Sequence, residues 1–263
     1  MKTRIISGIV MGAIVAAVLA IGMLWNSIII TVAISLLAAG AAYELLHNAV
    51  GITSKAAIIG ACVYSALSVF SINFTFWAYF IVSVIYVVYA VVVILKNHKD
   101  FPLAKIAAFG FMPLALSFAF FSLEGVINFA GGIYYLLLLL NFSSVCDMGA
   151  YFTGVTIGKH KLCPEISPKK TVEGAIGGIV WSMIVTVVLT LCFKKAILLP
   201  VILTIPFCIL GMIGDLFASV IKRSVGLKDY GNLIPGHGGV LDRVDSIIMI
   251  APPLFILITH GVL

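Results

Sequence analysis

Residues 5–43 read IISGIVMGAIVAAVLAIGMLWNSIIITVAISLLAAGAAY, 39 residues without a single charged side chain. A continuous helix of that length would measure about 58 Å, whereas the hydrocarbon core of a bilayer is about 30 Å thick. One straight span therefore does not fit. The polar interruption at Trp25–Asn26–Ser27 predicts two membrane-spanning helices joined at that point.

The rest of the chain has the same character. Of its 263 residues, 62% are hydrophobic and only 10% are charged, and the mean hydropathy is +1.22. A soluble domain of this size buries only about three quarters of the surface that its unfolded chain exposes, so it could not hide so much apolar surface. The composition predicts an integral membrane protein and excludes an ordinary soluble enzyme. The five cysteines are scattered, with no CxxC pair or zinc-like spacing, and we assign them no redox or metal role.

Further apolar runs predict seven more spans, which gives nine in all. They lie at about 56–71, 73–95, 103–123, 133–155, 174–193, 197–221 and 246–262. With nine spans and the N-terminus inside, fourteen of the sixteen Lys and Arg residues fall on the inner face, and only Lys194 and Lys195 fall outside. Such a bias is typical of the cytoplasmic face. We expect one all-α membrane domain over 1–263, with less specific helices over 1–130 and the catalytic helices and loops over 131–263.

The scarce charge is concentrated near the C-terminus. The segment from Ser219 to Ser246 reads SVIKRSVGLKDYGNLIPGHGGVLDRVDS. On the helix that leads into it, Asp215 lies about 10 Å deeper in the membrane than Lys222. With Ser219, these residues follow an i, i+4, i+7 spacing and share one helix face. An intramembrane carboxylate is costly and indicates a functional site; the alternative is a structural acid paired with a cation from another helix.

The second acid pair follows at the start of the last span, where Asp242 and Asp245 stand three residues apart. Aspartates from two helices supply the hard oxygen ligands that Mg²⁺ prefers, and that ion also binds substrate phosphates. We therefore predict metal ligation by Asp215 and Asp242, with Asp245 and Asp147 as further candidates.

Glycines and cations surround these acids. Gly238 and Gly239 allow backbone amides to approach an anion. Four cations of the same loop suit phosphate oxygens: Lys222, Arg223, Lys228 and Arg243. A cation cluster alone is also compatible with a solvated face or anionic lipid headgroups. His237 has three open interpretations, as a phosphate donor, a general acid–base group or a spacer in the loop.

An upstream polar loop has related features. Asp147 falls inside an apolar segment, and the piece SPKKT precedes the next predicted helix. Its hydroxyls and ammonium groups, on Ser167, Lys169, Lys170 and Thr171, resemble an anion site at a helix N-terminus. The alternative is a basic anchor beside the membrane.

Together these residues resemble the phosphatidate cytidylyltransferases, also called CDP-diacylglycerol synthases. The family pattern is S-x-x-K-R, four residues, K-D, a small residue, P-x-H-G-G and D-R-x-D. Every fixed position is present: Ser219, Lys222, Arg223, Lys228, Asp229, Gly231, Pro235, His237, Gly238, Gly239, Asp242, Arg243 and Asp245. The upstream AYFTG, GKHKL and SPKKTVEG pieces also resemble the family, so the resemblance covers about 147–245.

The resemblance implies an all-helical membrane bundle that transfers CMP from CTP to phosphatidate, giving CDP-diacylglycerol and pyrophosphate for phospholipid biosynthesis. It implies dependence on Mg²⁺ and a second, monovalent cation such as K⁺. It also implies a homodimer acting at the cytoplasmic face. Within this pattern, we expect Ser219, Lys222, Arg223, Lys228, His237 and Arg243 to serve catalysis.

Two other functions compete with this one. Nucleotidyl transfer to another lipid phosphate, such as a polyprenyl phosphate, would use similar residues. A transporter for an anionic substrate would also place acids in the membrane, but it predicts an internal repeat, and none is visible. A CDP-alcohol phosphotransferase is disfavoured because its DG…AR…G…D…D pattern is absent. We expect a bacterial inner membrane and no nucleic-acid partner.

Overall fold

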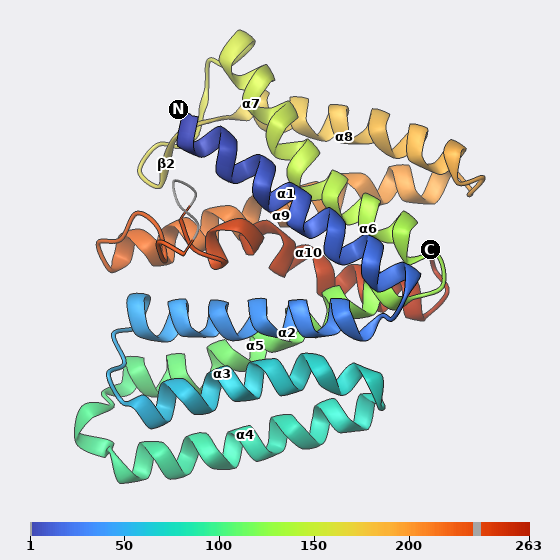
Figure 1. Ribbon diagram of the computed structural model, residues 1–263. Helices are drawn as coiled ribbons and strands as arrows, with labels where there is room; N and C mark the ends of the chain where they lie inside the picture. Colours follow the sequence, from blue (N-terminus) through green and yellow to red (C-terminus); the bar gives the residue numbers. More distant parts are fainter. Residues whose placement is uncertain (1, 234–237) are drawn as a thin grey trace. The chain divides into compact units, whose positions relative to one another are not determined.

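The computed structural model describes residues 2–233 and 238–263, with the backbone alone for residues 2–6 and Phe76. The described chain is almost entirely helical (Figure 1). Its first two helices are α1, Lys2–Leu24, and α2, Ile28–Tyr43. The predicted break in the first apolar run is confirmed, because the residues between Leu24 and Ile28 form a turn. Just before α2, the side-chain oxygen of Asn26 accepts the backbone N–H of Ile28 at 2.9 Å, which satisfies one of the first amides of the helix.

Eight further α-helices of the described residues cover the other apolar runs, and two of them, α6 and α7, are joined end to end by a π-helical turn. They are α3 Lys55–Phe70, α4 Phe76–Lys96, α5 Leu103–Asn128, α6 Gly132–Leu140 with α7 Cys146–Ile157, α8 Val172–Cys192, α9 Leu198–Ser224 and α10 Leu241–Thr259. Short 3₁₀ turns occur at Ser71–Asn73 and His98–Asp100. Among the described residues, eight helical segments are long and apolar enough to cross a membrane. They establish an integral membrane protein, while the ninth span stays a prediction, because α10 carries three charged residues in its first two turns.

Two π-helical turns, labelled η1 and η4, interrupt these helices. The turn η1, Glu44–Ala49, extends α2, and η4, Asn141–Val145, joins α6 to α7. Such turns are rare and occur frequently at functional sites. Each adjoins a polar residue discussed below, since η1 contains Glu44 and η4 ends two residues before Asp147.

A small β-hairpin was not predicted from the sequence. Strand β1, Lys161–Cys163, pairs antiparallel with β2, Ser167–Thr171, and Lys161 lies opposite Thr171. The hairpin contains the SPKKT piece and ends where α8 begins. The prediction that a helix follows SPKKT directly is confirmed.

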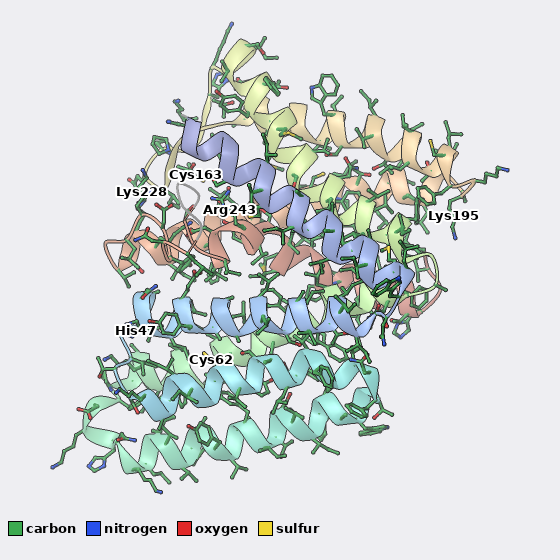
Figure 2. The ribbon with its side chains drawn as sticks, in the orientation of Figure 1. His47, Cys62, Cys163, Lys195, Lys228 and Arg243 are labelled. Atoms are coloured by element: carbon green, nitrogen blue, oxygen red, sulfur yellow. The ribbon has the colours of Figure 1, made fainter. Side chains whose placement is uncertain are left out.

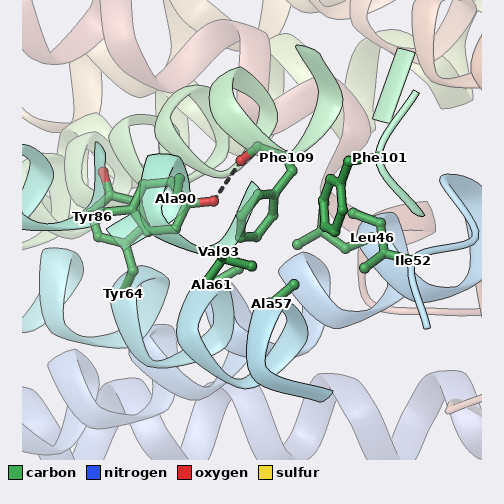
Figure 3. Packing of buried hydrophobic residues seen from close by; sticks show 10 residues of the cluster. All are labelled: Leu46, Ile52, Ala57, Ala61, Tyr64, Tyr86, Ala90, Val93, Phe101 and Phe109. Atoms are coloured by element: carbon green, nitrogen blue, oxygen red, sulfur yellow. Dashed lines mark hydrogen bonds between the residues drawn. The ribbon is translucent and has the colours of Figure 1, made fainter. Parts of the chain in front are cut away.

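The chain divides into two compact units that interleave along the sequence. Unit 1 comprises residues 1–125 and 225–244, and unit 2 comprises residues 126–224 and 245–263. In unit 1, α2, α3 and α4 lie side by side (Figure 1). Their core includes stacked rings of Tyr64 and Tyr86, with centroids 4.2 Å apart. The Tyr86 hydroxyl donates to the Phe109 carbonyl at 2.6 Å, which satisfies a polar group inside an apolar cluster (Figure 3).

Unit 2 is organised around α7, α8 and α9. Helices α7 and α8 approach closely because glycines line their contact, and a Cβ at Gly178 would meet the carbonyl oxygen of Cys146. Small residues allow this close approach of helices in membranes. Figure 2 shows Lys195 beyond one end of α8 and Cys163, in the hairpin, near the other. The hairpin cations and Lys195 therefore lie at opposite ends of the helix, as the predicted topology requires.

Candidate active site

Three aspartates from three helices of unit 2 lie close enough to interact electrostatically. They are Asp147 on α7, Asp215 on α9 and Asp245 in the first turns of α10. Asp147 interacts with Asp215, and Asp245 interacts with both. Carboxylates repel one another at short range, so this arrangement requires neighbouring cations. We call these three residues the acid cluster.

One such cation comes from the hairpin. The Lys170 ammonium forms an ion pair with the Asp215 carboxylate, and both side chains are about one quarter exposed. Lys170 also interacts with Asp147. A predicted phosphate-binding residue thus contacts a predicted metal ligand 45 positions further along the chain. The alternative interpretation of Asp215, a structural acid paired with a cation from another helix, predicted a cationic partner. Asp215 has such a partner, but this lysine lies on strand β2 and not on a helix.

A second cation is supplied by α9 itself. Lys222 is only 8% exposed and interacts with Asp245. Burying an ammonium is costly unless opposite charges compensate for it. Ser219 lies between Asp215 and Lys222 on the same helix face and is half-buried. The polar stripe predicted on this helix therefore includes one member of the acid cluster, Asp215. Arg223, the residue after Lys222, is exposed.

The local structure of the hairpin explains how Lys170 is held. Thr171, which follows it, is the N-cap of α8, and its hydroxyl oxygen accepts the backbone N–H of Gly174 at 3.1 Å. Thr171 is buried, so this hydroxyl fixes the strand-to-helix junction. Ser167 is half-buried and Lys169 is exposed on the same strand. Phosphate binding by these three residues stays a prediction.

The second acid of the predicted metal pair belongs to unit 1. Asp242 is buried, and its Oδ2 accepts the backbone N–H groups of Tyr230 at 2.8 Å and Gly239 at 3.0 Å. These bonds close the loop that precedes α10. Asp215 and Asp242 lie in different units, and their convergence on one metal ion stays a prediction.

The remaining predicted residues belong to unit 1, in the loop before α10 and, for Arg243, in the first turn of α10. Lys228 and Arg243 are exposed (Figure 2). Gly238 has φ +85°, a backbone conformation that glycine adopts without strain. His237 lies outside the described residues, and its three interpretations stay open.

The described residues contain no ready-made metal site, in the sense of three or more His, Cys, Asp or Glu side chains that could together hold an ion. Mg²⁺ needs only one or two protein carboxylates when substrate phosphates and waters complete its octahedron. The pairs within the acid cluster fit that lower requirement.

Comparison with known proteins places this chain in a family. A model of the "Cytidylyltransferase family" matches residues 2–260, nearly the whole chain. The chain belongs to the cytidylyltransferase family. The recognition made from the charged loop is confirmed, and the match extends through the N-terminal helices, beyond the residues 147–245 that carry the resemblance.

Relatives of this family member carry a more specific name. Proteins named phosphatidate cytidylyltransferase from Staphylococcus saprophyticus and Bacillus subtilis are each 46% identical, over 129 and 118 residues. These matches cover 48% and 43% of the chain, and 50% and 42% of the relatives, so the chain spans about half the length of these relatives or less. A Staphylococcus aureus protein of the same name is 34% identical over 69% of each chain.

Sequence reasoning missed polar residues in the N-terminal half of this cytidylyltransferase-family chain. Glu44 is only 4% exposed, and its carboxylate accepts hydrogen bonds from the loop before α10. Asn48, one turn later, donates to the carbonyl of Tyr230 at 2.6 Å. Glu124 is fully buried on α5 and accepts a bond from Thr31. An available signal was the position of Glu44, the first acid after the uncharged run of residues 5–43.

Proposed function

We propose that the protein is a phosphatidate cytidylyltransferase. A phosphate oxygen of phosphatidate attacks the α-phosphorus of CTP. The bond from that phosphorus to the oxygen that bridges it to the β-phosphorus breaks, and pyrophosphate leaves. The products are CDP-diacylglycerol and pyrophosphate. The family membership and the names of the relatives support this reaction.

The structural observation that carries the proposal is the Lys170–Asp215 ion pair beside Asp147 and Asp245. Phosphatidate carries about −1.5 to −2 charges as a phosphomonoester, and CTP adds several more. Phosphoryl-type transfer depends mainly on positioning and charge neutralisation. A site that gathers acids for a metal ion and lysines for phosphates meets both demands, and no covalent nucleophile is needed.

The metal ion implied by this chemistry is Mg²⁺. We propose that Asp215 and Asp245 hold it, with Asp147 adjacent and Asp242 as the further ligand predicted from the sequence. When bound, Mg²⁺ would neutralise charge on the CTP phosphates. Lys170 and Lys222 would then contact phosphate oxygens, with Lys170 exchanging its ion pair with Asp215 for a substrate phosphate.

The membrane setting suits a lipid substrate. Asp215 lies on a helix long and apolar enough to span the bilayer, about two turns before its polar end. The acyl chains of phosphatidate would stay in the bilayer while its phosphate meets CTP from the cytoplasm. The cytoplasmic orientation, the bacterial inner membrane, the homodimer and a monovalent cation such as K⁺ are parts of this proposal that follow from the family resemblance and the charge bias.

The deciding experiment supplies the purified protein with α-³²P-labelled CTP and phosphatidate in detergent micelles, with Mg²⁺ or with excess EDTA. We expect labelled CDP-diacylglycerol only when Mg²⁺ is present. Parallel reactions replace phosphatidate by a polyprenyl phosphate, or CTP by UTP or ATP. Label in the polyprenyl product alone would reassign the acceptor. If no reaction gives labelled lipid and proteoliposomes with the protein take up substrate, the enzyme hypothesis fails and the transporter hypothesis takes its place.

A further inference from the structure

The loop that precedes α10 is held from a distant part of the chain. Glu44, on the π-helical turn η1, accepts the backbone N–H of Val240 through Oε1 and that of Leu241 through Oε2, both at 3.0 Å. All of these residues belong to unit 1. The first amides of a helix have no partner within the helix. Glu44 therefore caps α10 from almost 200 residues away in the sequence.

Asp242 completes the same arrangement. Its Oδ2 accepts the N–H groups of Gly239 and Tyr230, so three consecutive amides, at residues 239–241, point at two carboxylates. The two acids lie near enough to repel each other. The converging amides and the positive end of the helix dipole offset that repulsion. If Glu44 lost its bonds, the amides of Val240 and Leu241 would be left buried without their acceptor, and the first turn that carries Asp242 would loosen.

The π-helical turn η1, which follows α2, contacts the loop at two points. Asn48 lies four residues after Glu44, and its amide group donates to the carbonyl of Tyr230. The side chain of Tyr230 is almost fully buried, its N–H is bound by Asp242 and its carbonyl by Asn48. Figure 2 shows His47, on the same turn, and Lys228 toward the same end of unit 1. The turn η1 thus binds the loop on both sides, through Asn48 at Tyr230 and through Glu44 at Val240 and Leu241.

We propose that Glu44 is a positioning residue for Asp242. By capping α10, its carboxylate fixes the orientation of the Asp242 side chain and, with Asn48, the course of residues 230–231 and 238–241. This inference rests on the proposed cytidylyltransferase activity, in which Asp242 is a predicted metal ligand. Groups behind the ligands of a metal site commonly change affinity or activity by about 10- to 100-fold when they are removed.

The test compares Glu44→Gln and Glu44→Asp with the wild-type protein in lipid nanodiscs. Glutamine keeps the size of the side chain but has one acceptor oxygen, so one of the two amides would face an NH₂ group. Aspartate keeps the charge but is shorter by one methylene, about 1.5 Å. A matched control is Thr31→Val, which removes a hydroxyl of the same helix, α2, together with its buried hydrogen bond to the Glu124 carboxylate, without touching the loop.

Two measurements are needed, because a loss of activity alone could reflect general damage. Hydrogen–deuterium exchange at residues 239–241 should become at least about tenfold faster in Glu44→Gln and unchanged in Thr31→Val. In the same samples, kcat for CDP-diacylglycerol formation should fall about 10- to 100-fold in Glu44→Gln, with the KM for CTP changed less than about threefold. Glu44→Asp should recover part of both effects, and Thr31→Val should keep kcat within about twofold.

Unchanged exchange at residues 239–241 in Glu44→Gln would overturn the inference, whatever the activity. Faster exchange with kcat within about twofold of wild type would show that Glu44 has only a structural role, and this result would also overturn the inference. A loss of kcat in Thr31→Val as large as that in Glu44→Gln would overturn it too. If the wild-type protein makes no CDP-diacylglycerol, the proposed function fails. The exchange measurement then still decides whether Glu44 holds the start of α10.

Discussion

At the scale of single residues, the chemistry of this protein depends on buried charge that is compensated locally. Asp215 meets Lys170, Lys222 lies beside Asp245, and Glu44 meets the amides that begin α10. Each charge would be costly in an apolar setting without its partners. Substitutions that keep shape and remove charge are therefore the informative ones.

We expect Asp215→Asn to insert and fold but to lose CDP-diacylglycerol formation by about 100-fold or more in kcat, since the proposed metal ligand and the partner of Lys170 disappear together. The measurement is turnover of labelled CTP at saturating Mg²⁺, after size-exclusion chromatography has verified a monodisperse protein. Asp100→Asn, on the exposed turn after α4, serves as the control and should keep wild-type turnover. Near-normal rates in Asp215→Asn would remove this residue from the metal site. Asp242→Asn tests the second predicted ligand in the same way.

Close approach of Glu44 also explains two glycines of the family pattern. A Cβ at Gly231 or Gly239 would overlap the Glu44 carboxylate. We expect Gly239→Ala to lower the free energy of unfolding of the protein by about 1–3 kcal/mol. The same change should cost clearly less when Glu44 is already alanine, because the obstructing carboxylate is gone. Additive losses across this double-mutant cycle, measured by thermal unfolding in detergent, would contradict a direct clash.

At the scale of elements, the helices of unit 2 hold the acid cluster because they approach closely. Asp147 on α7 and the hairpin before α8 come together where α7 packs against α8. Gly178 is central to that contact, since an added Cβ would meet a backbone carbonyl, which cannot move aside as a flexible side chain can.

We therefore expect Gly178→Ala to destabilise the protein by about 1–3 kcal/mol and to reduce turnover, because the distance between α7 and α8 must increase. Gly110→Ala is the matched control. A Cβ there meets nothing within 4 Å, and alanine is the better helix former by about 1 kcal/mol. Equal melting temperatures for the two variants would show that the α7–α8 contact tolerates a methyl group.

At the scale of the whole molecule, the distribution of charge sets the orientation in the membrane. Lys194 and Lys195 follow α8 and are exposed, whereas the hairpin cations precede that helix. The positive-inside bias predicts that the hairpin faces the cytoplasm and Lys195 the opposite side. For the proposed reaction, this orientation also decides which compartment would deliver CTP.

We expect a cysteine introduced at Lys195 to react with a membrane-impermeant maleimide in intact cells, and one introduced at Lys228 to react only after the membrane is opened. A Cys192→Ser background removes the exposed native thiol near the first site. Labelling of Lys228→Cys in intact cells would reverse the topology and place the loop before α10 outside.

The sequence by itself determined the membrane class, the two helices within residues 5–43 and most span positions, because hydrophobicity belongs to individual residues and the bilayer thickness limits helix length. It also predicted a set of site residues, because their chemical types and spacing are local, and their roles stay predictions. Only the tertiary structure joined Lys170 to Asp215, formed the hairpin and brought Glu44 and Asn48 to the loop before α10. Apart from the hairpin, which is local, those contacts connect residues far apart in the chain, and no local pattern specifies which distant partner will neutralise a buried charge or accept a helix's first amides.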